Sequence, residues 1–154
     1  MPWQDIWIVL QQEFSDLSEI GDITRVTVRL LVATALGGIL GYEREAVGAS
    51  AGLRTHMMVS LGAALFVLVP LQTGMPVADV SRVIQGLAAG IGFLGAGAIM
   101  KRWEASEIHG LTTAAGIWLT AAVGCAAGLG HEATAVLSTA LALIIFSLLR
   151  FTKK

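Results

Sequence analysis

Residues 108–131, IHGLTTAAGIWLTAAVGCAAGLGH, run for 24 positions without an Asp, Glu, Lys or Arg. A helix needs about 20 mainly apolar residues to cross the hydrocarbon core of a bilayer. Because this stretch is long enough and apolar enough, it predicts a transmembrane helix at 111–129. Lipid, rather than water, is therefore expected to surround this part of the chain.

The remainder of the chain has the same character. Of its 154 residues, 55% are hydrophobic and 14% are charged, whereas soluble domains carry roughly 25% charged residues. Further runs with few or no charges predict four more helices, at 26–43, 55–72, 83–101 and 133–150. The expected fold class is an all-α membrane protein with five transmembrane helices within a domain at 23–154.

The basic residues are distributed unevenly around these helices, and they predict the orientation of the chain. Lys and Arg accumulate in loops on the cytoplasmic side of a membrane. With five spans, Arg25 and Arg82 fall on one side, and the other side holds Arg44, Arg54, Lys101, Arg102, Arg150, Lys153 and Lys154. We therefore expect the N-terminus outside and the C-terminus in the cytoplasm.

The first 22 residues are acidic and contain no base. An apolar stripe with spacings of three and four is formed by Trp3, Trp7, Leu10, Phe14 and Leu17. Such spacing is typical of one face of a helix, and Trp favours the membrane interface. Residues 1–22 are thus expected to form an interfacial amphipathic helix on the outer face, with the acids on its solvated side.

Two parts of the sequence resemble each other. GILG at 38–41, followed by GLRTHMMVSLGAA at 52–64, matches GFLG at 92–95, followed by GLTTAAGIWLTAA at 110–122. Two predicted helices separate the copies, so both copies have the same orientation, as in a parallel repeat. The starts of helices 55–72 and 111–129 are expected at equivalent places around one centre.

Glycines at a spacing of four mark two of the predicted helices. They are Gly37 and Gly41 in the first helix and Gly86 and Gly90 in the third, where Gly92 and Gly95 extend the surface. Small residues let helix backbones approach closely within lipid. We expect helix 26–43 to pack against helix 83–101, and a homodimer through one of these faces is the alternative.

A cluster of polar residues lies at the cytoplasmic ends of the first two predicted helices. It consists of Glu43, Arg44, Glu45, Arg54, Thr55 and His56. Carboxylates are ligands that Mg²⁺ prefers, but Arg44 and Arg54 would compete for them through ion pairs. Two interpretations stay open: a structural lock in which Arg54 neutralises Glu43 or Glu45, and a site for a polar ligand or ion. The sequence leaves the metal unknown, and it indicates no cofactor beyond Mg²⁺.

Other polar residues fall inside the predicted helices, namely Arg29, Ser60, Gln85, Thr112, Thr113 and Thr120. Ionised groups in a membrane are costly and mark functional sites, but a long Arg side chain near a helix end also reaches the headgroups. Both interpretations of Arg29 stay open. The hydroxyls and the amide are expected to form hydrogen bonds between helices, or to line a polar path.

The sequence also argues against two classes of function. Its net charge of −1 gives no basic surface for a nucleic-acid partner. None of the common catalytic motifs occurs in it, so we expect a protein that is not an enzyme.

Several of these motifs together resemble the MgtC/SapB family of bacterial inner-membrane proteins. They are LGGILGYERE at 36–45, AGLRTH at 51–56, GIGFLGAG at 90–97 and GLTTAAGIWLTAA at 110–122, in the same order as in the family. The resemblance implies a five-helix membrane domain and a link to growth at low magnesium. In some virulent members it also implies survival inside host cells and restraint of the ATP synthase.

The resemblance leads to two alternative functions. The chain is expected to be a membrane regulator linked to magnesium homeostasis, and the alternative is an oligomeric transporter or channel for Mg²⁺ or another cation. The implied partners are membrane lipid, a second copy of the chain, and a membrane protein such as the ATP synthase. Many family members carry a soluble C-terminal domain, whereas this sequence stops at Lys154, so a minimal form is expected.

Overall fold

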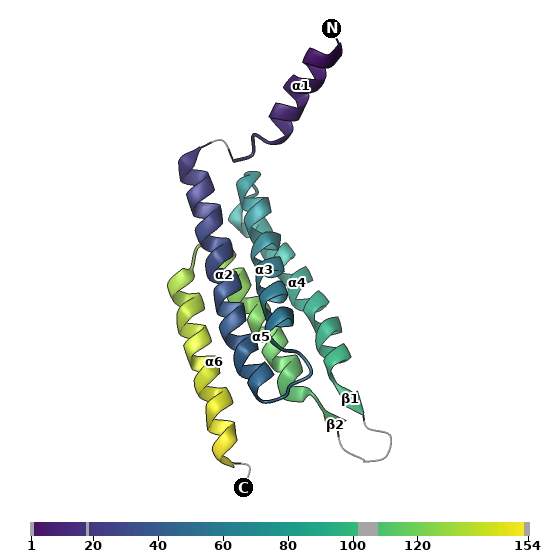
Figure 1. Cartoon of the computed structure of the whole chain (residues 1–154), viewed down its shortest axis with the longest axis vertical. Coiled ribbons are helices and arrows are strands. Elements are labelled where there is room, and N and C mark those ends of the chain that lie inside the picture. The colour runs from purple at the N-terminus through teal and green to yellow at the C-terminus, as the bar shows by residue number, and fades with distance from the viewer. Residues whose placement is uncertain (1, 18, 102–107, 153–154) are drawn as a thin grey trace.

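The structure is a computed structural model, and it describes residues 2–17, 19–101 and 108–152. A short helix, α1 (Pro2–Glu13), precedes five long helices (Figure 1). These are α2 (Ile20–Ala46), α3 (Leu53–Gln72), α4 (Val77–Ala98), α5 (Leu111–Gly128) and α6 (Glu132–Thr152). Two-residue strands, β1 (Met100–Lys101) and β2 (Ile108–His109), pair antiparallel between α4 and α5.

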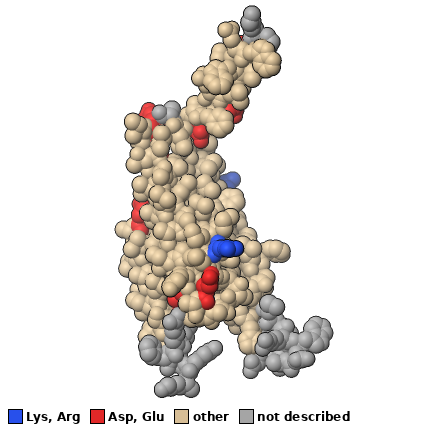
Figure 2. All heavy atoms as spheres, in the orientation of Figure 1, with Lys and Arg blue, Asp and Glu red and all other residues tan. Residues whose placement is uncertain are grey.

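The predicted helical fold is confirmed, and the described residues supply four helices, α2 to α5, that are long and apolar enough to cross a membrane. The part of α6 whose side chains are described, Glu132–Leu148, is a shorter apolar helix. Few charged side chains appear on the face of the bundle in Figure 2. Length and composition therefore identify a multi-pass membrane protein.

The helix ends differ from the prediction mainly at two starts: α4 begins at Val77 rather than at 83, and the start of α2 differs by the same number of residues. This helix begins at Ile20 rather than at 26, so the expected boundary between residues 22 and 23 falls inside a helix. The polar turn that contains Asp22 and Arg25 continues the helix, and these two side chains form an ion pair of 2.7 Å across it. The uncharged run in the sequence indicates only the part of the helix that lies in the hydrocarbon core of the membrane. The helix itself continues beyond that part, because its backbone hydrogen bonds also form where charged side chains are present.

Helix α1 is shorter than the apolar stripe that predicts it. It ends at Glu13, so Phe14 and Leu17 lie beyond its end. The Ser15 hydroxyl donates a hydrogen bond to the carbonyl of Gln12 at 2.6 Å, and such side-chain bonds compete with the helical pattern. The interfacial position of α1 stays a prediction.

Helices α3 and α5 form the centre of the bundle. Of the most apolar 18-residue stretch of each helix, 56% is buried in α5, compared with 11% in α4. Helix α5 contacts α2, α3, α4 and α6, and α4 and α6 flank the bundle on opposite sides (Figure 1). A core cluster joins α2, α3, α5 and α6 and includes Leu36, Leu40, Ala64, Val123, Ala142 and Phe146.

The predicted packing of the first against the third long helix is wrong. No extensive contact joins α2 to α4 within the described chain. Gly37 and Gly41 lie instead against α3, where an added Cβ on Gly41 would come within 2.7 Å of the Leu53 Cα. Two glycines four positions apart show that a helix has a face without side chains, but they do not identify the helix that covers that face.

The glycines of α4 divide into two groups. Gly95 lies against Ala114 of α5, because a Cβ added to Gly95 would be 3.6 Å from the Ala114 Cβ. A Cβ added to Gly86, Gly90 or Gly92 would meet nothing within 4 Å in the described structure. Most of the predicted glycine surface of α4 therefore has no partner among the described residues.

The two copies of the sequence repeat make matching contacts. Gly41 of α2 approaches His56 near the start of α3, and Gly95 of α4 approaches Ala114 near the start of α5. These glycines correspond in the aligned repeats, and so do His56 and Ala114. The pairs α2–α3 and α4–α5 therefore use one packing arrangement twice, with α3 and α5 in contact at the centre.

Candidate functional site

The polar cluster lies where the last turn of α2 meets the first turn of α3. The Arg44 side chain is 8% exposed and the Glu43 side chain 11% exposed, and they form an ion pair. The guanidinium group also lies over the ring of Phe146 in α6, with 3.8 Å between its central carbon and the ring centroid. Because a buried guanidinium needs a counter-charge or a ring face, these two contacts explain how Arg44 is accommodated.

Glu45 has a different role at the same end of the bundle. Its Oε2 accepts a hydrogen bond of 2.8 Å from the backbone N–H of Leu53. The first N–H groups of a helix lack partners inside the helix, and a carboxylate there also stabilises the helix dipole. Glu45 therefore caps α3 from across the loop, and it connects the end of α2 to the beginning of α3.

His56 is fully buried, near the ion pair of Glu43 and Arg44. Its Nδ1 lies 2.9 Å from the carbonyl oxygen of Gly52. Because a carbonyl only accepts, Nδ1 must carry the proton, and Nε2 of the neutral ring is then an acceptor. No described group bonds to Nε2 or to Oγ of Ser60, which is buried one turn further along α3.

The small residue Gly116 in α5 allows these side chains to converge. A Cβ at this position would lie 3.6 Å from His56 Nε2, 3.9 Å from Arg44 Cδ and 3.4 Å from Phe146 Cζ. Four helices, α2, α3, α5 and α6, thus contribute to one buried polar centre. We call Glu43, Arg44, His56, Ser60 and Phe146 the buried cluster.

Two residues of the predicted cluster lie outside it. Arg54 and Thr55 are exposed, and within the described residues no ion pair joins Arg54 to Glu43 or Glu45. The predicted lock through Arg54 is therefore wrong. His56 and Ser60 face the bundle, and at 100° per residue the side chains of positions 54 and 55 must then point elsewhere.

The remaining polar residues of the helices also divide by burial. Ser60, Thr113 and Thr120 are buried, whereas Gln85 and Thr112 are exposed. The Thr120 hydroxyl donates to the carbonyl of Gly116 in its own helix at 2.8 Å, not to another helix as expected. The hydroxyl of a Thr in a helix can donate to the backbone carbonyl one turn earlier in the same helix, so it needs no partner on another helix.

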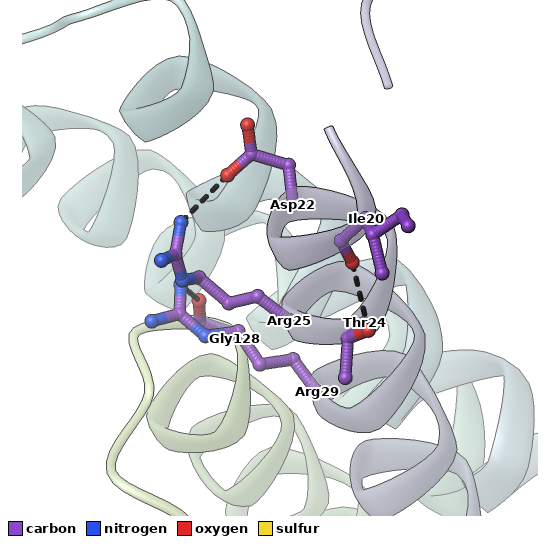
Figure 3. A network of polar contacts seen from close by, with 6 residues as sticks. All are labelled: Ile20, Asp22, Thr24, Arg25, Arg29 and Gly128. Carbon is purple, nitrogen blue, oxygen red and sulfur yellow. Dashed lines mark hydrogen bonds and ion pairs between the residues drawn. The ribbon is translucent and has the colours of Figure 1, made fainter. Parts of the chain in front are cut away.

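Arg29 lies near the opposite end of the bundle and joins α2 to the end of α5. Its Nη1 donates to the Gly128 carbonyl at 3.1 Å (Figure 3). Its Nε lies 4.0 Å from Glu132 Oε1, and the side chain is 21% exposed. The guanidinium thus binds a carbonyl that the end of α5 leaves without a partner inside the helix. Both interpretations of Arg29, as a functional group and as a side chain that reaches the headgroups, stay open.

Sequence reasoning overlooked Phe146 and the glycines of α5. Gly116, Gly124 and Gly128 lie at spacings of eight and four, which place them on one face of that helix. A Cβ on Gly124 would collide with the Ser60 carbonyl, and one on Gly128 would come within 2.5 Å of the Ala64 carbonyl. This spacing was visible in the sequence, whereas the position of Phe146 beneath Arg44 had no local signal.

The charges of the site do not form an evident metal centre. Among the described residues, no group of three or more His, Cys, Asp and Glu side chains is placed to hold a metal ion. The oxygens of Glu43 and Glu45 are engaged by Arg44 and by the Leu53 N–H, respectively. The geometry fits a set of contacts that fasten helices together better than it fits a divalent cation.

Comparison with known proteins agrees with the motifs. The family model described as "MgtC family" matches residues 30–154. "Protein SrpB" of Synechococcus elongatus is 40% identical over 138 residues, which cover 82% of this chain and 76% of that protein. No solved structure matches this chain.

Two further relatives are longer than this chain. "Putative magnesium transporter YhiD" of Escherichia coli is 38% identical over 125 residues, which cover 77% of this chain and 57% of that protein. "Protein MgtC" of Salmonella typhimurium is 40% identical over 123 residues, which cover 80% of this chain and 52% of that protein. The chain thus spans little more than half of these two relatives, and it belongs to the MgtC family.

Proposed function

We propose that this chain is a five-span protein of the bacterial inner membrane that regulates a membrane-embedded partner in magnesium homeostasis. The observation that carries the proposal is the filled interior of the bundle. Between the buried cluster and Arg29 the core is formed by Ala33, Leu40, Ala64, Val67, Val123 and Ala127, each at most 1% exposed. This part of the core also holds Thr120 and Thr139, whose buried hydroxyls donate to carbonyls of their own helices. Among the described residues it therefore offers a hydrated cation no continuous set of polar groups to replace its water.

The length of α6 supports a fifth span. Its 21 residues give a rod of about 31 Å at about 1.5 Å per residue, which matches a hydrocarbon core of about 30 Å. Helix α6 also contacts α2 and α5, both of which are long enough to cross. Five crossings, with the basic residues inside, then place the N-terminus outside and the buried cluster near the cytoplasm.

The link to magnesium comes from the relatives. YhiD is named "Putative magnesium transporter", and the family resemblance carries the same association with magnesium. In this chain, the pairing of Glu43 with Arg44 and of Glu45 with the Leu53 N–H favours a rigid end of the bundle over a cation site. A rigid bundle with a helix face that no described helix covers is suited to bind another membrane protein.

An oligomeric cation transporter is the second candidate, and one feature favours it. The α4 face that contains Gly86 and Gly90 has nothing within 4 Å of either added Cβ in the described chain. Copies of the chain that assemble through this face would create a path between protomers rather than within one. The name "Putative magnesium transporter YhiD" refers to transport as well.

Reconstitution separates the two candidates. The full chain in liposomes that contain a fluorescent Mg²⁺ indicator is expected to give no more gradient-driven uptake than protein-free vesicles. Uptake that Glu43→Gln abolishes would contradict the regulator proposal, provided that Glu19→Gln, an exposed acid outside the bundle core, leaves that uptake intact.

Crosslinking tests the partner. A photoreactive residue in place of Phe93, which is 83% exposed on α4, is expected to capture a different membrane protein in the native membrane. The family resemblance makes subunits of the ATP synthase the first proteins to look for in the product. Capture of only a second copy of the chain would support the oligomeric transporter instead.

A further inference from the structure

A cavity of about 520 Å³ opens at the end of the bundle that carries α1. Its lining combines two acids and two bases with apolar side chains: Asp16, Asp22, Arg25, Arg29, Leu68 and Leu71. We call it the interface pocket. It lies at the opposite end of α2 from the buried cluster, so it is separate from the site described above.

The two arginines of the interface pocket are one turn apart on α2. Figure 3 shows both guanidinium groups on the same side of that helix, near the end of α5. Arg25 Nη1 binds Asp22 at 2.7 Å, and Arg29 Nη1 binds the Gly128 carbonyl at 3.1 Å. Each guanidinium has five N–H donors, so both can donate to an anion in the cavity while these contacts are kept.

The acids make the pocket unsuitable for a ligand with negative charge alone. Asp16 and Asp22 line the same cavity as the arginines, and their carboxylates would repel a plain anion. A ligand that carries a phosphate beside an ammonium group would match both signs. The apolar side chains Leu68 and Leu71 complete the lining, and they match a hydrocarbon portion of the same molecule.

The position of the pocket agrees with the depth of lipid headgroups. Most of its lining residues come from the start of α2 and the end of α3, and Figure 1 shows these two helix ends at the end of the bundle that carries α1. Helix α1 exposes Trp3 at 76% and Trp7 at 62%, and Trp is enriched at the boundary between hydrocarbon and water.

We propose that the interface pocket binds the headgroup of a phospholipid with a primary ammonium, such as phosphatidylethanolamine. The phosphodiester is held by Arg25 and Arg29, and the ammonium by Asp16 and Asp22. Soluble phosphoethanolamine has the same polar chemistry, but only the lipid makes use of the leucines. The proposal needs a membrane location and does not depend on the choice between regulator and transporter.

Native mass spectrometry of the purified full chain in detergent tests the proposal, with equal amounts of phosphatidylethanolamine, phosphatidylglycerol and phosphatidylcholine added. The wild type is expected to retain phosphatidylethanolamine in preference to the other two. Arg25→Gln is expected to lower that retention about tenfold, because a bond to a charged group is lost. Arg54→Gln removes an exposed arginine at the opposite end, and it is expected to leave retention unchanged.

A second variant tests the acids. Asp22→Asn is expected to reduce the preference for phosphatidylethanolamine over phosphatidylcholine, since a primary ammonium donates hydrogen bonds that a quaternary ammonium lacks. Equal retention of the three lipids by the wild type, or equal effects of Arg25→Gln and Arg54→Gln, would overturn the proposal. Displacement of the lipid by an equal concentration of phosphoethanolamine would assign the pocket to a soluble ligand and overturn the lipid assignment.

Discussion

Among the charged side chains that form the described ion pairs, Arg44 is the most buried, with 8% of its side chain exposed. It contacts an acid of its own helix and a ring from α6, so it connects two helices that are distant in sequence. Arg54, ten positions later, has the same chemistry but faces outward. The two arginines allow a direct comparison of buried and exposed charge.

We expect Arg44→Gln to lower the free energy of unfolding in detergent by about 2 kcal/mol, because a desolvated cation–π contact is lost together with an ion pair. Arg54→Gln is expected to change it by less than about 0.5 kcal/mol, as is usual for exposed positions. Unfolding by denaturing detergent, followed by circular dichroism, measures both. Equal effects of the two substitutions would show that burial of Arg44 contributes nothing.

Arg29 makes the corresponding connection at the other end of α2. Arg29→Gln is expected to destabilise the bundle by about 1.5 kcal/mol or more, because its charged hydrogen bond to the Gly128 carbonyl is lost. Glu132→Gln should cost less, since its oxygen lies 4.0 Å from the Arg29 Nε, at the limit of an ion pair. Thermal melting of the two variants under identical conditions gives the order, and a larger loss for Glu132→Gln would contradict this geometry.

At the scale of helices, close packing depends on α5 rather than on α4. The backbone of α5 touches α3 at Gly124 and Gly128, whereas Gly86 and Gly90 of α4 meet no described atoms within 4 Å of an added Cβ. In the sequence repeat, α2 corresponds to α4 and α3 corresponds to α5. In the described chain α5 packs against four other helices, whereas α4 packs mainly against α5 and, less extensively, α3. The three glycines of α5 therefore matter more for packing than the five of α4.

Gly124→Val tests this difference. The added side chain would collide with the Ser60 carbonyl, and overpacking of this kind costs about 1–3 kcal/mol. Gly90→Val meets open space and is expected to leave the unfolding free energy of the monomer nearly unchanged. Both values come from the same detergent unfolding curves, and a Gly90→Val variant that is as unstable as Gly124→Val would refute the packing described here.

The Gly90→Val variant also serves as a test of assembly. If α4 faces lipid, the oligomeric state by light scattering should be the same as in the wild type. A shift from a larger assembly to the monomer would indicate that copies meet through this face, and it would favour the oligomeric transporter.

At the scale of the whole molecule, the odd number of proposed spans determines the sides of the membrane on which the two ends lie. A cysteine at Gly48, an exposed position between α2 and α3, is expected to react with a membrane-impermeant reagent only from the cytoplasmic side. A cysteine at Gly74, between α3 and α4, should react only from outside. The native Cys125 is buried, but its replacement by Ser provides a clean background, and the opposite labelling pattern would reverse the orientation.

The sequence determined the elements of this protein: apolar runs of membrane length predict the helices, because the hydrocarbon core sets the length of a helix that crosses it. The motifs at 36–45 and 51–56 also identified the family and the region of the buried cluster. Local composition carries this information, and it requires no knowledge of which helices are neighbours.

Only the tertiary structure decided which residues meet. Glu45 binds the Leu53 N–H, Arg44 lies over Phe146, and Gly37 and Gly41 face α3 rather than α4. Nearly every helix in lipid is apolar around its whole surface, so hydrophobic patterning does not indicate its inward face or its partner. Steric fit between helices far apart in the sequence makes that choice, and it exists only once they are packed together.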